Sequence, residues 1–321
     1  MPNLTTRAVS DATKTLPVDL MIFGWWNTSL SPVGRDRADD NHKQISARIV
    51  KSLIDELNFD CLALGEITTA DLSMMKSGCE TQALAVFDGT LKTGRLQFDT
   101  GVIYNDSRLR ILNSKSITSS HGHRNYKIAN RIDFECISDG SHFHLFVSHW
   151  PSRGVREENI LMRETIADRL KAQIRAIEEI AADAAIIVVG DFNDEPFDQS
   201  LAWNMLATRD RGLAKTKTGY LYNPFWRRLG ESKPHTSLDT KGGAAGSCFY
   251  RTETSTRWRT FDQMLFSSAF LGKGEWHLNE DQTTILESDF LIELVQSDDV
   301  HFDHLPVLSV VERFAKQNGD D

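Results

Sequence analysis

Cysteine is scarce in this sequence. Its 321 residues include four cysteines, Cys61, Cys79, Cys136 and Cys248, and no two of them have C-x-x-C spacing. Cys61 and Cys136 lie in strand-like apolar runs, where a reduced cysteine packs as a small hydrophobic side chain. The pattern predicts neither a disulfide framework nor a zinc site, which suits a protein of a reducing compartment.

Long apolar runs are also missing. No run approaches the roughly 20 residues that a transmembrane helix needs, and the first residues lack the apolar core of a signal peptide. We interpret residues 1–17 as a flexible N-terminal leader and residues 315–321 as a loose C-terminal tail. We therefore expect a soluble, cytoplasmic protein without a transmembrane segment.

Positive charge is in deficit, because the formal net charge at pH 7 is −9. Such a chain does not coat nucleic acid or an anionic membrane with its whole surface, although a local basic groove remains compatible with it. With 40% hydrophobic and 25% charged residues, the composition is that of an ordinary soluble globular protein.

Apolar periodicity predicts a mixture of helices and strands. Apolar residues recur every three to four positions over residues 41–57 and 157–182, which is typical of helices packed on a sheet. Strand patterns cover residues 19–27, 60–66, 83–87, 100–105, 109–117, 130–137, 142–150, 184–189, 259–267 and 305–314.

Many of these strands follow one another without an intervening helix, and SDGS at 138–141 is a hairpin signal. This favours an α/β (α+β) protein built as a four-layer α/β/β/α sandwich, with two mixed, mainly antiparallel sheets packed face to face and helices outside. A doubly wound sheet is the alternative. No linker divides residues 18–314, so we predict a single domain. Within it, residues 200–260 are irregular, and GGAAGS at 242–247 is typical of a mobile loop.

Several buried-looking strands end on polar side chains that a core does not favour, because a buried carboxylate is costly without a compensating partner. Each alone fits a turn or a helix cap. Together their carboxylates and amides suit Mg²⁺, Mn²⁺ or Ca²⁺ better than zinc. The set is Asn27, Glu66, His149, Asp191, Asn193, Asp262, Asp303 and His304.

The order of these motifs resembles the endonuclease/exonuclease/phosphatase superfamily, whose members include deoxyribonuclease I. The likeness rests on GDFN at 190–193, the strand-end Glu66 and the pair Asp303-His304, and it runs from about Leu20 to Val311. It implies a metal-dependent hydrolase of phosphoric ester bonds that directs water in line with the leaving oxygen.

The resemblance also implies which residues handle the metal and the water. Asn27, Glu66 and Asp303 would bind Mg²⁺, with Mn²⁺ or Ca²⁺ as possible substitutes. Asp191 would orient and deprotonate the attacking water, and Asn193 would fix that water or contact the phosphate.

Further positions match phosphate-contacting residues of the superfamily. His149, in VSHWPSR, and His304 would donate to the phosphate, with Asp262 orienting His304. Arg131, in NRIDF, falls where several members have a phosphate-contacting arginine. Phe302 replaces the serine that usually precedes the Asp-His pair.

A basic segment at residues 209–259 bears on the substrate. It holds 11 Lys and Arg against 4 Asp and Glu, a net charge of +7, and several aromatic residues. Beside a phosphodiesterase site it could follow a nucleic-acid backbone and stack bases, so we predict a nuclease acting on nucleic acid. The alternative is solvated loop charge with the aromatic residues packed on the core.

Two other functions remain open. One is a phosphodiesterase or phosphatase acting on a lipid or inositol phosphate, although no amphipathic docking helix is evident. The other is a catalytically lapsed binding module, which the intact set of polar residues disfavours. DNA or RNA as substrate, endonuclease or exonuclease action, one or two metals and the oligomeric state also stay open.

Overall fold

A computed structural model describes residues 16–30, 38–93, 96–121, 124–153, 157–233, 235–237, 243–298 and 302–314. Of the predicted leader at 1–17, all but residues 16 and 17 lies outside these ranges. The predicted tail at 315–321 lies outside them entirely.

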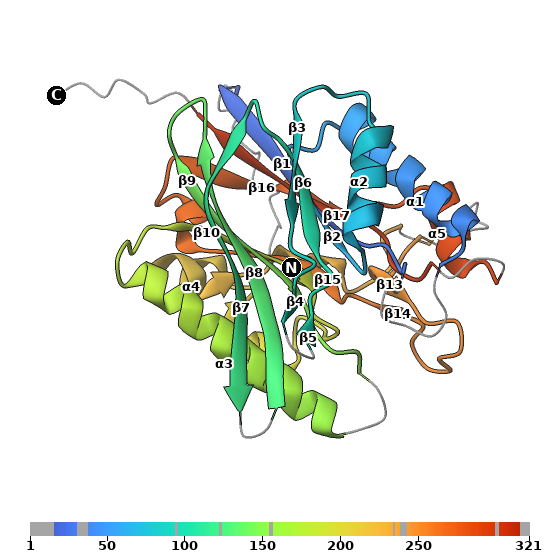
Figure 1. Cartoon of the computed structure of the whole chain (residues 1–321). Coiled ribbons are helices and arrows are strands. Elements are labelled where there is room, and N and C mark those ends of the chain that lie inside the picture. The colour runs from blue at the N-terminus through green and yellow to red at the C-terminus, as the bar shows by residue number, and fades with distance from the viewer. Residues whose placement is uncertain are drawn as a thin grey trace, which may run out of the picture.

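Two mixed sheets packed face to face form the centre of the molecule (Figure 1). The six-stranded sheet has the order β16 (Trp276–Ile285), β17 (Val307–Arg313), β1 (Asp19–Asn27), β2 (Cys61–Gly65), β6 (Gly101–Asn105) and β3 (Leu84–Asp88). The seven-stranded sheet has the order β11 (Ala207–Thr208), β12 (Leu221–Tyr222), β15 (Asp262–Phe266), β10 (Ala185–Asp191), β9 (His142–His149), β8 (Arg124–Cys136) and β7 (Leu109–His121). Most neighbouring strands are antiparallel, whereas β1 with β2, β9 with β10 and β11 with β12 are parallel.

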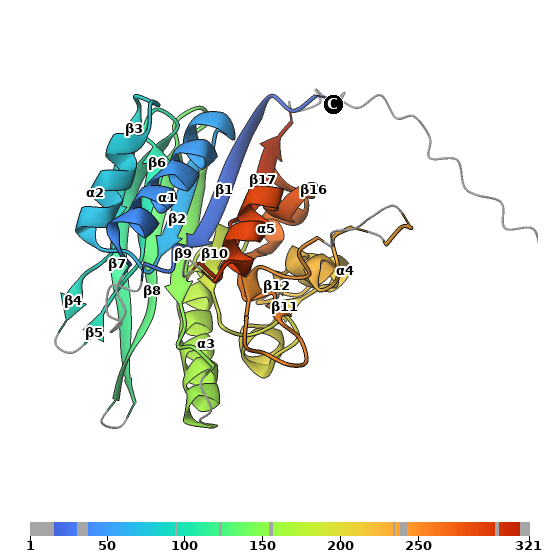
Figure 2. The same cartoon turned by 90° about the vertical axis from the view of Figure 1, so that its right-hand side faces the viewer.

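Helices cover the outer faces of both sheets (Figure 2). α1 (Asp40–Lys51) and α2 (Thr69–Gly78) lie outside the six-stranded sheet, and α3 (Glu157–Glu178) lies outside the seven-stranded sheet. The predicted four-layer sandwich is therefore confirmed. None of the helices among the described residues is both long and apolar enough to cross a membrane.

The remaining elements are short. They are the π-helical turns η1 (Ser52–Glu56) and η2 (Ser200–Asn204), the 3₁₀ turns η3 (Pro224–Arg228) and η4 (Ser268–Leu271), the helices α4 (Arg211–Thr216) and α5 (Asp289–Gln296), and the strand pairs β4 (Lys92–Thr93) with β5 (Leu96–Gln97) and β13 (Cys248–Phe249) with β14 (Trp258–Arg259).

Strand β10 is buried on both faces, as its run of β-branched residues predicts. Ile187 and Val189 point into the core between the sheets, whereas Ile186 and Val188 pack under α3. The strand therefore carries its terminal Asp191 directly into the interior, where that residue is 1% exposed.

The two predicted helices are correct in position and differ at their ends. Asp39 caps α1 by accepting a hydrogen bond from the His42 amide at 2.7 Å, and the last part of the predicted helix is the π-helical turn η1. The predicted helix 157–182 ends at Glu178, and Ile180 beyond it is 90% exposed. A turn is needed there, because β10 begins at Ala185.

One buried charge on α3 lacks a hydrogen-bond partner among the described residues. Lys171 is 3% exposed, and among the described residues its Nζ has no hydrogen-bond partner. Burial lowers the pKa of Lys171 to about 8, against the opposing charge of Glu178. The folded chain therefore binds this proton less tightly than the unfolded chain, in which the pKa is 10.5.

Replacing this ammonium should stabilise the protein. We expect Lys171→Met to raise the free energy of unfolding at pH 7 by roughly 1–3 kcal/mol, because it removes a buried charge without hydrogen bonds. The gain should shrink as the pH rises from about 8 to 10.5, since the wild-type lysine loses its proton there. Urea unfolding at both ends of that range measures the difference. The exposed Lys273→Met is the control, and an equal effect of both variants would contradict the burial argument.

Candidate active site

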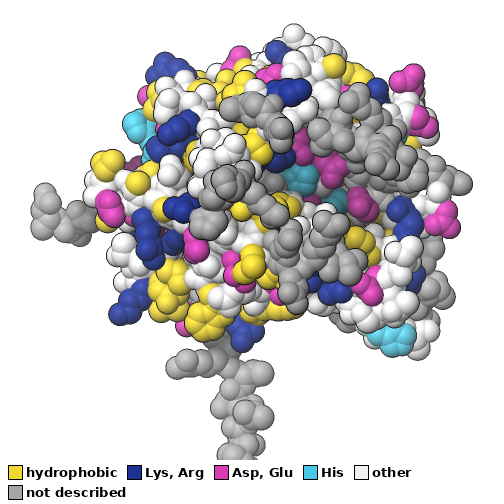
Figure 3. Space-filling model, turned by 60° about the horizontal axis from the view of Figure 1, so that its bottom comes forward, with side chains coloured by type: hydrophobic (Ala, Val, Ile, Leu, Met, Phe, Trp, Pro, Cys, Tyr) yellow, Lys and Arg dark blue, Asp and Glu magenta, His cyan; other side chains and the backbone are white. Residues whose placement is uncertain are grey.

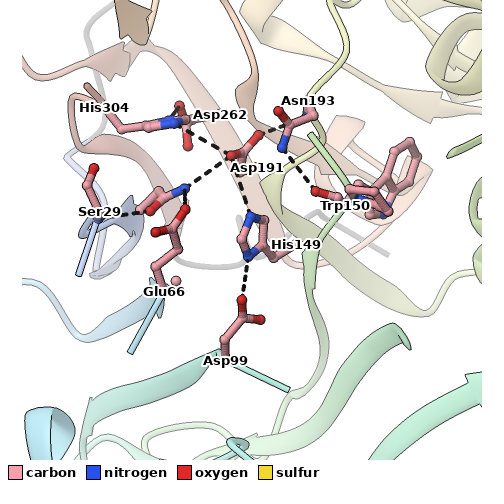
Figure 4. A network of polar contacts seen from close by, with 12 residues as sticks. Ser29, Glu66, Asp99, His149, Trp150, Asp191, Asn193, Asp262 and His304 are labelled. Carbon is pink, nitrogen blue, oxygen red and sulfur yellow. Dashed lines mark hydrogen bonds and ion pairs between the residues drawn. The ribbon is translucent and has the colours of Figure 1, made fainter. Parts of the chain in front are cut away.

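The carboxylate of Asp191 lies at the centre of a polar cluster where the central strands of both sheets end (Figure 4). Its Oδ2 accepts a hydrogen bond from Asn27 Nδ2 at 3.1 Å. The same oxygen lies 3.9 Å from His149 Nε2 and 3.7 Å from His304 Nε2. One buried oxygen thus faces an amide and two imidazoles.

Strand register positions these groups. The parallel pairing of β9 and β10 places His149 beside Asp191, and the antiparallel pairing of β10 and β15 places Asp262 on its other side. In the other sheet, Asn27 pairs with Gly65, so that Glu66 follows directly beside it. The predicted strand-end residues therefore meet because the strands that carry them are neighbours.

A second carboxylate, Asp262, holds His304. Its Oδ2 lies 2.7 Å from His304 Nδ1, and its two oxygens also accept hydrogen bonds from Trp25 Nε1 at 2.6 Å and Ser247 Oγ at 2.7 Å. Burial lowers the pKa of His304, but nearby negative charge, first that of Asp262, outweighs burial and raises it well above 6.5. The geometry therefore favours an imidazolium at His304.

His149 has its own carboxylate partner, Asp99, which the sequence reasoning missed. Its Nδ1 lies 3.0 Å from Asp99 Oδ2, and Lys127 Nζ lies 2.8 Å from Asp99 Oδ1. Burial lowers the pKa of His149, but Asp99, followed by Asp191 and Glu66, outweighs burial and raises it to about 9. Asp99 lies two residues before strand β6, so a search for polar residues before buried strands as well as after them could have found it.

The backbone at the site adopts unusual conformations. Asn193, Glu66 and Ser29 have positive φ angles of 51°, 56° and 53°, which non-glycine residues rarely adopt. Asn193 is held there because its amide donates to Asp191 Oδ1 at 2.8 Å and its Nδ2 donates to the Trp150 carbonyl at 3.0 Å. Strained conformations of this kind are often found at functional sites.

Glu66 and Asn27 are the residues best placed to hold a divalent cation. Asn27 Nδ2 lies 3.2 Å from Glu66 Oε1 and also contacts Asp191. Asp303 is linked to this pair through Ser29, whose amide donates to Asn27 Oδ1 and whose hydroxyl donates to Asp303 Oδ1 at 2.5 Å. These oxygen donors fit Mg²⁺, which prefers carboxylate and carbonyl ligands.

Two other close groups of potential ligands fit a metal less well. Asp191, Asp262 and His304 lie together, as do Cys248, Asp303 and His304. A histidine binds a metal only as the unprotonated imidazole, and a cysteine only as the thiolate. His304 favours its protonated form, and burial raises the pKa of Cys248 to about 12. We interpret both groups as hydrogen-bonded networks.

The structure does not bring Arg131 into the cluster. Arg131 pairs with Phe146 across β8 and β9, and its guanidinium lies over the Phe146 ring on the α3 side of the sheet. There its Nε donates to Asp133 at 2.8 Å. His149 continues the row of Leu145 and Val147, which face the other sheet. The phosphate contact predicted for Arg131 would therefore lie on the wrong face of the sheet.

Phe302, in place of the usual serine, is fully buried. Its ring stacks on Trp26 at 6.0 Å with an interplanar angle of 12°, and its centroid lies 3.9 Å from that of His42. The substitution therefore fixes the chain just before Asp303 and His304 against β1 and α1.

The molecular surface is hollowed on the face shown in Figure 3, and histidine and acidic side chains gather in the hollow. The close-up shows the carboxylate of Asp191 with His149 and His304 directed toward it. A carboxylate, two cationic donors and an oxygen-rich cation site together can orient water and stabilise the charge of a phosphate ester undergoing hydrolysis.

Sequence and structure comparisons agree with this interpretation. The sequence profile of the Endonuclease/Exonuclease/phosphatase family matches residues 91–301. No curated protein matches the chain.

Solved structures show a similar fold. One is the human Nocturnin catalytic domain with bound sulfate anion (15% identity, 93% of this chain and 97% of that chain covered, TM-score 0.60). Another is D. rerio TDP2 complexed with single strand DNA product (16% identity, 91% of this chain and 99% of that chain covered, TM-score 0.56). A third is mannosyl-6-phosphatase Bt3783 of Bacteroides thetaiotaomicron VPI-5482 (13% identity, 91% of this chain and 99% of that chain covered, TM-score 0.55). At these identities the likeness establishes the fold alone.

The pairing with Asp99 should control the protonation of His149. In the metal-free protein we expect the His149 ring to titrate near pH 9, and we expect Asp99→Asn to lower that pKa by at least about one unit, because it removes the adjacent negative charge. Histidine NMR titration measures the shift, with the His149 signal assigned by its loss in His149→Gln. An unchanged midpoint in Asp99→Asn would contradict the assigned pairing.

Cation binding should depend on Glu66. We expect Glu66→Gln to weaken Mg²⁺ or Mn²⁺ binding about tenfold or more, because the side chain loses its charge while keeping its shape. Calorimetric titration measures the affinity. Glu80→Gln, at a side chain that is 84% exposed, is the matched control. Equal affinities of the two variants would place the cation elsewhere.

Proposed function

The chain belongs to the endonuclease/exonuclease/phosphatase family and is a hydrolase of phosphoric esters, and from that premise we propose that it is a divalent-metal-dependent nuclease. One observation carries the proposal. The buried carboxylate of Asp191 lies between two histidines that each have a carboxylate behind them, next to the Asn27–Glu66 pair.

Asp191 is the proposed base. Burial raises its pKa, although the imidazoles of His304 and His149 act in the opposite direction. A carboxylate with a raised pKa accepts a proton from water more readily near neutral pH. Asn193 lies beside it and would orient the same water molecule.

The two histidines are the proposed phosphate donors. His149 and His304 approach Asp191 through their Nε2 atoms, and their Nδ1 atoms are occupied by Asp99 and Asp262. Both therefore present one N–H toward the place where a phosphate would lie. A divalent cation held at Glu66 and Asn27 would polarise a phosphate oxygen as a Lewis acid.

The basic segment 209–259 supports nucleic-acid binding over only part of its length. Arg211 and Arg227 both pair with Glu280, at 3.1 and 2.9 Å, and the guanidinium of Arg209 packs over the Trp226 ring. These three charges are therefore engaged in contacts within the protein.

The later part of the segment does adjoin the site. Ser247, in the predicted mobile loop, is fully buried against Asp262, and Phe249 N donates to the Asp303 carbonyl. The guanidinium of Arg257 lies over the Phe249 ring. Any basic track for a nucleic-acid backbone should therefore begin at this strand pair, β13 and β14. The structure of D. rerio TDP2 with a single strand DNA product supports a nucleic acid as substrate.

Cleavage assays test the proposal. Supercoiled plasmid and a labelled single strand are incubated with Mg²⁺, with and without EDTA. We expect EDTA to stop cleavage, and Asp191→Asn and His304→Ala to reduce the rate by about 10²-fold or more, because each removes a group that acts on the reacting phosphate or water. The matched controls are Asp183→Asn and His142→Ala, which change exposed residues of the same types.

The alternative substrates are tested in the same way. Release of phosphate or headgroup from an inositol phosphate, a lipid or a sugar phosphate, without cleavage of either nucleic acid, would assign the site to a smaller ester. The assay with small phosphate esters is needed because a mannosyl-6-phosphatase has a similar fold. No cleavage of any phosphate ester by a protein that binds Mg²⁺ would contradict the proposed function.

A further inference from the structure

A pocket of about 390 Å³ lies directly beside the candidate site. Glu66 and His149 form one side of it, and α3 and the start of β8 form the other. Asp191 and Asn193 do not line it. A phosphate held at Glu66 and His149 would therefore have this pocket next to it, while the place of the attacking water stays outside.

The walls of the pocket are apolar on one side and polar on the other. Met162 and Ile166 of α3, together with the largely buried Tyr126, supply apolar surface. Lys127 and Asn125 supply the polar part. Among the described residues, the Asn125 amide oxygen accepts from Ser120 Oγ at 2.6 Å, which leaves the amide nitrogen available as a donor.

From this lining we infer that the pocket binds one unpaired nucleoside attached to the phosphate at Glu66 and His149; the inference rests on the proposed function. A nucleobase combines apolar faces with a hydrogen-bonding edge, and proteins bind unpaired bases by covering the faces and meeting the edge.

The size of the pocket and the polarity of its lining disfavour other occupants. Pockets for single small ligands measure roughly 300–1,000 Å³, so this one holds one nucleoside and excludes a base pair within a duplex. A polyol such as inositol would place hydroxyl groups against Met162 and Ile166 without partners, which is costly. An acyl chain would desolvate the Asn125 amide nitrogen without giving it a hydrogen bond.

The consequence for the substrate is specific. Only a single strand, a frayed end or a mononucleotide ester can place one base in this pocket while its phosphate contacts His149. The pocket therefore makes the protein selective for unpaired nucleic acid without reading the sequence along the strand.

Binding of small phosphate esters tests the inference. The probes are thymidine 3′- and 5′-monophosphate, methyl phosphate, inositol 1-phosphate and a short-chain phosphatidic acid, each titrated with Mg²⁺ present in a calorimeter. We expect one of the thymidine monophosphates to bind about tenfold or more tightly than methyl phosphate, because the base buries apolar surface that a methyl group lacks.

Two variants fill the pocket, and one serves as the control. Met162→Trp occupies its apolar side, and Ser152→Trp reaches it from an exposed position without disturbing the core. Leu161→Trp adds the same ring at a neighbouring side chain that is 63% exposed. We expect the first two to weaken thymidine monophosphate binding about tenfold and to leave methyl phosphate binding unchanged. Leu161→Trp should leave both unchanged. Thermal unfolding shows which variants are folded.

The outcomes separate this inference from the proposed function. Nucleic-acid cleavage by the wild type, combined with equal binding of thymidine monophosphate and methyl phosphate, would contradict the nucleoside pocket but leave the proposed nuclease function intact. Tighter binding of inositol phosphate or phosphatidic acid, sensitive to Met162→Trp, would overturn the nucleoside as occupant. Failure of the wild type to hydrolyse any phosphate ester would overturn both.

Discussion

The carboxylate of Asp262 is fully buried between the two sheets, and three donors from distant parts of the chain hold it there. Trp25 comes from the six-stranded sheet, Ser247 from the loop before β13, and His304 from the segment before β17. Burying this charge would be prohibitive without such partners. The hydrogen bonds that compensate for it are therefore also the bonds that join the sheets at the candidate site, so that the geometry of the site and the packing of the sheets depend on the same atoms.

Close packing of the backbone also fixes the geometry around Asp191. The strand that carries it approaches its neighbour so closely that a Cβ on Gly190 would lie 1.7 Å from the Ser148 carbonyl oxygen. This close approach of β9 and β10 sets the separation of His149 and Asp191. Together with the positive φ angles of Asn193 and Glu66, it shows a site whose geometry is fixed by the backbone and then refined by hydrogen bonds.

Much of the fold and part of the site could be predicted from the sequence, because apolar periodicity and strand-end polarity are local. The burial of β10 and the meeting of Glu66, Asp191 and His304 follow from such patterns. Ser247 could not be found in this way, since a tertiary contact alone connects it to Asp262. Asp99 stands before a strand rather than at its end, and only a tertiary contact identifies it as the partner of His149. For Arg131 the sequence gives a position along a strand but not the face, which register decides. The pairing of Arg211 and Arg227 with Glu280 could not be predicted for a similar reason, because Glu280 lies far away in the sequence.

The stacking of Phe302 on Trp26 connects strand β1 to the segment before β17. Strand β1 pairs with β2 on one side and with β17 on the other, and the last site residues, Asp303 and His304, stand just before β17. During synthesis the N-terminal part of a chain emerges first. The segment that carries Asp303 and His304 is therefore synthesised long after Asn27 and Glu66. A chain that has not yet been synthesised as far as His304 lacks that side chain, so the candidate site is complete only after the segment before β17 has been made.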